Sequence, residues 1–468
     1  MRAENAARTG RTLGLVLVLS AQFMIMLDGS IVTVALPSVQ RELGFSPSGV
    51  QAVVTAYNTA LGGGLILGGR IGDLCGRRRV LLVGMAGFAA ASLLCGLAQS
   101  AVLLVGGRVL QGLCAALIAP TALALLTTSF PEGPERARAM SRFGIATVLG
   151  FVGGLVASGP LLEAFGWRGV FFVTVPVGAA MAVLTPRLVA SSPRKARRLD
   201  VPGALLITLG VAALVVAPAQ GGAAGWTSAR CLVPIAVGIV LLVAFLLVER
   251  RHPEPLVRLG LFRSRTLRAA NAVSFASGMM SGAAYLLVTL YLQEVRNLGP
   301  VRAGLVVAPV GLLNLALGTV LGRTVTRLGL RAAVSGATAC AGALLALVAS
   351  QMTPGRNVLL FGLVLLPFGM AMLATTVTST LAATSGVAPD EQGLAGGVRQ
   401  TSFQLGIAIG VAALVSLAAG RAAALHGPRA AALADGYRTA LYVLAGLVIA
   451  ASALALAMIR DARRPPRD

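Results

Sequence analysis

Long apolar stretches separated by short polar loops occupy almost the whole of this chain. Each stretch is about 20 residues long, the length that an α-helix needs to cross a bilayer. In hydrocarbon the backbone must satisfy its own hydrogen bonds, so such spans are helices rather than open strands. We therefore predict an all-α integral membrane protein with fourteen spans. They begin near Leu13, Val50, Val80, Ala101, Met140, Val170, Val201, Leu232, Ala269, Ala303, Ala332, Val358, Gly397 and Thr439.

Composition and the placement of charge support this prediction. Hydrophobic residues make up 56% of the 468 positions and charged residues only 12%. A net charge of +23 would suggest nucleic-acid binding in a soluble protein. With a cytoplasmic amino terminus, however, 29 of the 39 Lys and Arg residues lie in inward segments, as the positive-inside rule requires. We expect both termini in the cytoplasm, a lipid bilayer around the spans and no nucleic-acid partner.

Neither a cleaved leader nor a metal site is predicted. The first apolar run continues beyond the usual length of a signal-peptide core, so we interpret it as a retained first helix. The five cysteines are scattered without a Cys-x-x-Cys pair, and the two histidines lie in loops on opposite sides of the membrane. This pattern predicts no metal site and no disulfide.

A short internal repeat suggests a duplicated chain. Gly69 precedes Gly76 by seven residues, Gly322 precedes Gly329 by the same interval, and an arginine follows the first glycine of each pair. Duplicated halves with a binding site between them are typical of alternating-access transporters, although two basic turns also match by chance. We predict a cytoplasmic tail (1–12), a six-helix bundle (13–189), a linker with two extra spans (190–268), a second bundle (269–459) and a tail (460–468).

Two charged residues lie deep within predicted spans. Asp28 lies about 15 residues, roughly 22 Å, from the cytoplasmic start of the first span. Arg108 lies at a similar depth in the fourth span, with Gln111 one turn further on. Charges in a bilayer are costly and mark a functional site by default. We predict that Asp28 and Arg108 interact directly or through water and couple proton exchange; a purely structural salt bridge is the alternative.

A charged turn separates the second and third spans. Asp73 and Arg77 are four residues apart, which suits a local ion pair or a helix cap. Glycines in the same turn allow the backbone to bend sharply. We predict a cytoplasmic gate formed by Gly69, Arg70, Gly72, Asp73, Gly76, Arg77 and Arg78.

Other residues within the spans are candidates for packing or for a substrate cavity. Gly150 and Gly154 form a small-xxx-small pair in the fifth span, with Gly159 further along. Polar residues in the spans are candidate cavity lining, although each alone is more often an interhelical hydrogen bond. They are Gln22, Tyr57, Asn58, Gln111, Asn271, Asn314 and Gln404. We interpret Glu294, near the outer end of the ninth span, as a solvated loop acid.

Three segments together resemble the major facilitator superfamily, and within it the fourteen-helix drug:proton antiporters. GGRIGDLCGRRRVLL at 68–82 is similar to the superfamily's loop motif, LDGSIVTVALP at 27–37 resembles the first-helix motif, and RVLQGLCAA at 108–116 resembles the fourth-helix motif. The resemblance implies that Asp73, Arg77 and Arg78 gate the cytoplasmic side and that Arg108 takes part in proton transfer. The fifth helix departs from the antiporter pattern, because the family's Gly-Pro falls at Gly154-Leu155.

On this resemblance we expect a proton-coupled efflux transporter in a bacterial cytoplasmic membrane that exports drugs or antibiotics by alternating access. Protons are the coupling ion, no cofactor is needed, and we expect a monomer. A proton symporter that imports a small nutrient is the first alternative. An integral-membrane enzyme or sensor is the second; it would need a nucleophile, a metal cluster or an appended soluble domain, and the sequence shows none.

Overall fold

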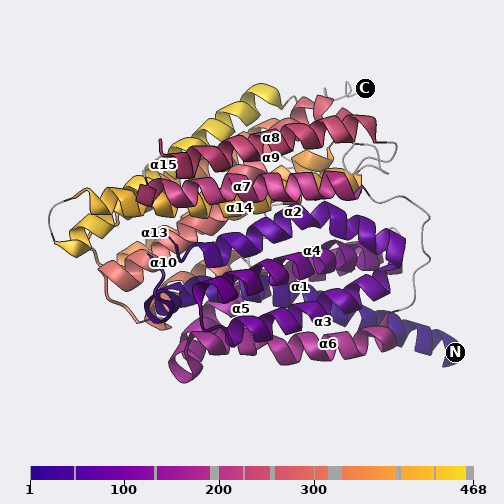
Figure 1. The fold of residues 1–468 in the computed structure, drawn as a ribbon. Helices are drawn as coiled ribbons and strands as arrows, with labels where there is room; N and C mark the ends of the chain where they lie inside the picture. Colours follow the sequence, from indigo (N-terminus) through magenta and orange to yellow (C-terminus); the bar gives the residue numbers. More distant parts are fainter. Residues whose placement is uncertain are drawn as a thin grey trace.

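The computed structural model describes residues 2–46, 49–130, 134–189, 200–224, 227–252, 259–299, 301–314, 329–385, 387, 392–425 and 428–459. These residues form helices that lie alongside one another (Figure 1), and no strand occurs among them. The helices are α1 (Arg2–Leu43), α2 (Ala52–Cys75), α3 (Arg77–Gly96), α4 (Ala101–Ser129), α5 (Pro134–Phe172), α6 (Thr174–Leu188), α7 (Val201–Ala224), α8 (Ala229–Arg251), η1 (Leu259–Arg263), α9 (Arg265–Met279), η2 (Met280–Ala284), α10 (Tyr285–Leu290), η3 (Tyr291–Val295), the helix Val301–Asn314, α12 (Leu330–Ser350), α13 (Val358–Thr384), α14 (Gln392–Ala423) and α15 (Arg429–Met458).

Ten helices in the described part of the chain are long and apolar enough to cross a membrane. Two shorter apolar helices, Pro202–Val215 and Val301–Asn314, accompany them. The last helix begins at Arg429, ten residues before the predicted start at Thr439. Its first turns carry polar residues, and a helix extends beyond the apolar run that the sequence shows. The structure is therefore an all-α membrane fold.

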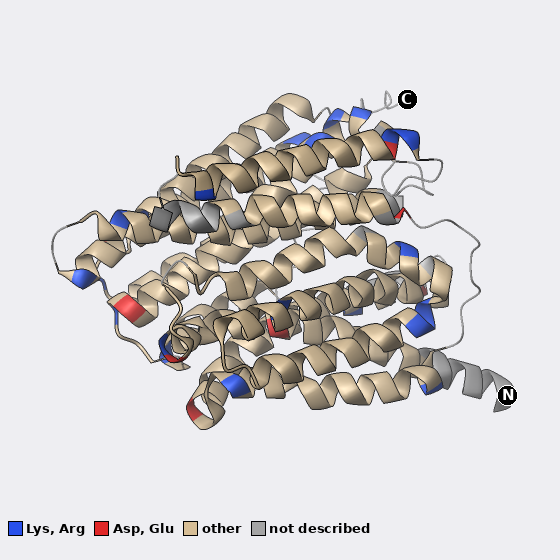
Figure 2. Ribbon diagram, viewed as in Figure 1, with Lys and Arg blue, Asp and Glu red and all other residues tan. Residues whose placement is uncertain are grey.

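Lys, Arg, Asp and Glu gather at the two ends of the helices, with few between (Figure 2). We call the end at which α1 begins and α15 ends the terminal face, and the other end the loop face. This distribution is the one that a bilayer imposes, because charged side chains are costly in hydrocarbon.

The packing of the first helices recurs later in the chain. Helix α1 packs on α5 and α3 packs on α4 and α6; correspondingly, α9 packs on α14 and α12 packs on α13 and α15. Glycines make both crossings close. A Cβ on Gly154 would lie 2.6 Å from the Leu27 carbonyl oxygen of α1, and a Cβ on Gly406 would clash with the Phe275 carbonyl of α9. Gly322, one member of the sequence repeat, lies outside the described residues.

Helices α7 and α8 pack on each other and join the two sets of helices. Thr208 of α7 donates a hydrogen bond to the Gly63 carbonyl of α2 at 3.2 Å. On its other side α7 packs on α14 (Figure 1), and Val211 and Val215 cluster there with Ala408 and Ala412. The pair is therefore part of the helix bundle rather than an appended module.

The apolar core is shared at one end and divided at the other. Near the loop face one continuous core includes Ile31 and Val53 of the first helices and Leu286 of α10. Towards the terminal face the first helices have their own core, with Met24, Tyr57 and Leu81 among its members. The later helices have another, with Leu267, Val334 and Ala383. Apart from a small cluster around α7, the two sets therefore pack together near the loop face and separately near the terminal face.

Candidate functional site

A buried ion pair joins α1 to α4. Arg108 Nη1 donates to Asp28 Oδ2 at 2.6 Å, and neither side chain is exposed to solvent. Gln111 closes a ring with this pair: its Oε1 accepts from Arg108 Nη1 at 2.9 Å, and its Nε2 donates to Asp28 Oδ1 at 3.2 Å. The direct contact between Asp28 and Arg108 is thus one of the two geometries that the sequence predicted.

Helices α2 and α3 complete the surroundings of the pair. Arg108 Nε donates to the Val53 carbonyl oxygen at 3.0 Å, and its guanidinium lies 4.2 Å from the centre of the Tyr57 ring. Gln111 Nε2 also donates to Ser92 Oγ at 2.8 Å. Four helices therefore hold these side chains, and the counter-charge and hydrogen bonds offset much of the cost of burying Arg108. Its Nη2 is buried without a partner among the described residues.

The spacing of Arg108 and Gln111 along α4 explains why both side chains reach Asp28. Residues three and four apart share a face of a helix, so Arg108 and Gln111 point in the same direction. Ser100 caps the start of α4 by accepting from the Leu103 N–H. Gly112 allows α2 to approach, because a Cβ there would clash with the Tyr57 carbonyl oxygen.

Gly29, the residue after Asp28, has no neighbouring side chain against it among the described residues. A Cβ built on Gly29 would meet no atom within 4 Å. Successive residues of a helix point about 100° apart, so Gly29 faces the open side of α1 while Asp28 faces Arg108 inside the first set of helices. In this structure the Asp28 carboxylate is therefore paired and shielded from solvent.

The predicted glycines of α5 lie at two different contacts. Gly150 and Gly154 pack against α1, where a Cβ would clash with the Phe23 carbonyl oxygen and with Ser30. Gly159 instead packs against the helix Val301–Asn314, with a Cβ position 2.6 Å from Val301 Cα. The fifth helix therefore has a close contact to the ion-pair helix and a close contact to the second half of the chain.

The predicted cavity residues take up separate positions. Tyr57 packs on Arg108, and Asn58 donates to the Val54 carbonyl of its own helix at 2.9 Å. Asn271 accepts from Ser402 Oγ of α14 at 2.7 Å. Gln404 is buried beside Gly62 of α2, Gln22 is buried in α1, and Asn314 ends the described part of its helix. Tyr57 and Gln111 therefore both contact Arg108, whereas Gln404 lies where α14 meets α2.

At the charged turn, α2 ends and α3 begins at Gly76, whose φ of 91° suits glycine. Arg77 Nη1 donates to the Ala124 carbonyl oxygen at 3.0 Å and to Thr128 Oγ1 at 3.1 Å, which connects α3 to the end of α4. The side chain of Asp73 lies outside the described part of the structure. Of the other predicted gate residues, Gly72 packs near Thr121 of α4, Gly69 lies near Pro120, and Arg70 and Arg78 are half-buried.

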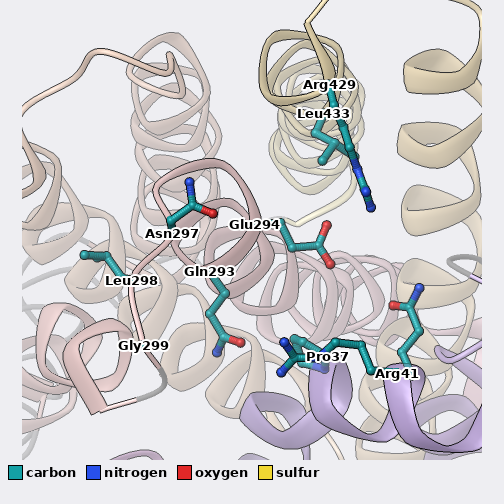
Figure 3. A pocket seen from close by; sticks show the side chains of 10 residues that line it. Pro37, Arg41, Gln293, Glu294, Asn297, Leu298, Gly299, Arg429 and Leu433 are labelled. Atoms are coloured by element: carbon teal, nitrogen blue, oxygen red, sulfur yellow. The ribbon is translucent and has the colours of Figure 1, made fainter.

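Near the loop face the structure reveals a polar pocket that the sequence did not indicate. Glu294 is not a solvated loop acid: it lies in the π-helical turn η3, and its Oε2 accepts from Tyr437 Oη of α15 at 2.6 Å. The pocket has a volume of about 540 Å³ and receives side chains from α1, η3 and α15 (Figure 3). They are Pro37, Gln40, Arg41, Gln293, Glu294, Asn297, Leu298, Gly299, Arg429 and Leu433.

Neither Glu294 nor Tyr437 belongs to a recognisable sequence motif, so only their contact in space reveals them. Metal chemistry has no comparable cluster: among the residues that the structure describes, no group of three or more His, Cys, Asp or Glu side chains is placed to hold an ion.

Comparison with known proteins adds to this geometry. Residues 18–411 match the family model described as Major Facilitator Superfamily. The puromycin resistance protein pur8 of Streptomyces alboniger is 38% identical, covering 99% of this chain and 95% of that protein. The cephamycin export protein CmcT of Amycolatopsis lactamdurans is also 38% identical, covering 88% of each. A solved D-xylose-proton symporter shares the fold, with a TM-score of 0.67 at 14% identity, over 96% of this chain and 97% of that one.

Proposed function

Because this chain belongs to the Major Facilitator Superfamily, we propose that it is a proton-coupled efflux transporter that exports drugs or antibiotics across a bacterial cytoplasmic membrane. Relatives that match most of its length are named for antibiotic resistance or export. The substrate class is carried over from these names, and the proton coupling is argued from the residues of the chain itself.

We propose fourteen spans arranged as two six-helix bundles, residues 13–189 and 269–459, with α7 and α8 as the extra pair. The terminal face is then cytoplasmic, which agrees with the arginine-rich charged turn at that face. In this orientation the shared core near the loop face closes the outer side, and the divided cores leave the inner side open. The protein works as a monomer in the bilayer.

The single observation that carries the proposal is the fully buried Asp28–Arg108 pair. A proton that reaches Asp28 from outside neutralises the carboxylate and removes the partner of Arg108. The paired and unpaired forms favour different arrangements of α1 and α4, so protonation shifts the balance between inward-open and outward-open states. Exchange of substrate for protons requires that both ligands bind the two states unequally.

Transport by an Asp28→Asn variant tests the proposal. Inverted vesicles containing the wild-type protein accumulate an exported drug when a pH gradient is applied, and cells that express it become resistant. We expect the variant to lose both activities while remaining in the membrane. Unchanged gradient-driven accumulation by the variant would reject the role of Asp28, and accumulation in the opposite direction by the wild type would indicate an importer.

A further inference from the structure

A second cation within the helices is Arg399 of α14, a half-buried residue whose Nη1 atom is buried. It follows Gln392, the first residue of α14, by seven positions, or about 10 Å along the axis. It also lies inside the stretch Ala395–Ala423 that is apolar and long enough to cross a membrane. An ionisable residue at such a position is a candidate for binding a ligand or an ion.

Arg399 is only partly satisfied by the protein. Its Nη2 donates to the side-chain Oε1 of the adjacent Gln400, whereas its Nη1 is buried and has no hydrogen-bond partner among the residues that the structure describes. No carboxylate among the described residues forms an ion pair with it. Arg108, by contrast, has Asp28 as a counter-charge. A buried guanidinium without a counter-charge is unfavourable, and an incoming anion would relieve this cost.

Arg399 lies close to two glycines of α14 that have no neighbouring side chain among the described residues. Gly396 lies three residues earlier, and positions three apart share a helix face. A Cβ on Gly396 or on Gly397 would meet no atom of the described residues within 4 Å, so the described part of the structure leaves space beside α14 at this level. The main apolar cores of the two sets are separate towards this face, and the smaller cluster around α7 includes the adjacent Val398.

The chemistry of the two side chains selects the ligand. A guanidinium presents a planar fork of donors that matches the two oxygens of a carboxylate, and charge-assisted bonds of this kind are stronger than neutral ones. We propose that Arg399, with Gln400 beside it, binds the carboxylate of an anionic or zwitterionic substrate in the open space at the terminal end of α14. This assignment rests on the proposed transport function and specifies a substrate class for it.

Binding of two matched dyes to the purified protein tests the assignment. Rhodamine B has a free carboxylate at pH 8, and in its ethyl ester an ethyl group masks that carboxylate and removes its negative charge. In detergent without added anionic lipid, we expect the wild type to bind rhodamine B about tenfold more tightly than the ester, as a charge-assisted bond predicts. Fluorescence anisotropy measures both dissociation constants, and it needs neither a proton gradient nor transport.

Two variants and one control decide the outcome. Arg399→Gln should bring the ratio of dissociation constants close to one, and Arg399→Lys should leave it intermediate, because lysine keeps the charge without the fork. Arg268→Gln removes an exposed arginine from the terminal end of α9 and should keep the wild-type ratio. Binding of the ester shows that a variant is folded; if Arg399→Gln fails this check, Arg399→Lys decides.

Three results would overturn the assignment. The first is a wild-type ratio near one or no binding of rhodamine B. The second is an Arg399→Gln variant whose ratio of dissociation constants for the two dyes equals that of the wild type. The third is displacement of rhodamine B, but not of its ester, by phosphatidylglycerol and not by phosphatidylcholine. That result would mean that the site binds the phosphate of an anionic lipid. None of these results depends on whether Asp28 couples protons, so failure of this assignment and failure of the proposed function remain distinguishable.

Discussion

Arg108 Nη1 lies 2.6 Å from Asp28 Oδ2, although the two residues belong to helices α4 and α1 and neither side chain is exposed. Gln111 bonds to both, so the three side chains form one hydrogen-bonded unit. Burying two charges is costly, and their attraction offsets that cost only with good geometry. While Asp28 is ionised, the two charges compensate each other. Neutralising Asp28 leaves the Arg108 guanidinium without a counter-charge.

Removing one charge should destabilise the protein more than removing both. Asp28→Asn leaves a buried guanidinium without a counter-charge, which costs about 3–5 kcal/mol when one partner of a buried pair is lost. The double variant Asp28→Asn/Arg108→Gln should recover much of this stability, and it should still lack gradient-driven transport. Thermal unfolding in detergent measures the stability. A double variant that is less stable than Asp28→Asn would contradict the account.

The ring of Tyr57 matters more than its hydroxyl in this state. The ring lies under the Arg108 guanidinium, and the buried hydroxyl has no hydrogen-bond partner in the described part of the chain. Tyr57→Phe should therefore retain stability, whereas Tyr57→Leu should lose about 1–2 kcal/mol from the desolvated cation–π contact. Thermal unfolding of the two variants compares them directly. Equal losses of stability in Tyr57→Phe and Tyr57→Leu would contradict this account, because they would mean that the Tyr57 hydroxyl forms a stabilising hydrogen bond.

Adjacent glycines of α5 provide a matched pair. Gly154→Ala would place a Cβ against Ser30 and the Leu27 carbonyl, and overpacking of this kind costs about 1–3 kcal/mol. At Gly153 the nearest atom to an added Cβ is Phe23 Cζ at 3.6 Å, so Gly153→Ala should stay within about 0.5 kcal/mol of the wild type. The free energy of unfolding in mixed micelles is the measurement, and equal losses in the two variants would contradict the crossing of α1 and α5.

Arg77 should affect the rate of transport more than substrate binding. Its bonds to the Ala124 carbonyl and to Thr128 hold α3 against the end of α4. Losing hydrogen bonds from a charged group costs about 1.5–3 kcal/mol, so Arg77→Ala should lower the maximal efflux rate at least tenfold. The exposed neighbour Arg79 serves as the control in Arg79→Ala. A changed KM with an unchanged maximal rate would assign Arg77 to the substrate site instead.

The sequence predicted the features that depend on local pattern. Apolar stretches of bilayer length gave the helices, and three motif segments indicated the superfamily that the match over residues 18–411 confirms. The depths of Asp28 and Arg108 along their helices indicated that the two could meet, because depth in a membrane follows directly from residue count.

Features that depend on which helices are neighbours could not be predicted. Glu294 and Tyr437 are 143 residues apart and meet only because η3 lies beside α15. Likewise, no periodicity in residues 201–224 indicates that α7 packs between α2 and α14. Apolar helices in lipid carry little information about their partners, since lipid and a neighbouring helix are equally apolar. For the same reason the sequence did not indicate that Tyr57, a candidate cavity residue, packs on Arg108.

The pH dependence of substrate affinity tests the central claim most directly. Rhodamine B ethyl ester keeps its charge between pH 6 and pH 8, so any change in its dissociation constant over this range reports on the protein. If Asp28 exchanges the coupling proton, linkage requires protons to weaken substrate binding. We predict that the wild-type dissociation constant rises as the pH falls and that the Asp28→Asn value stays constant. An Asp28→Asn protein with the wild-type pH dependence would contradict the account.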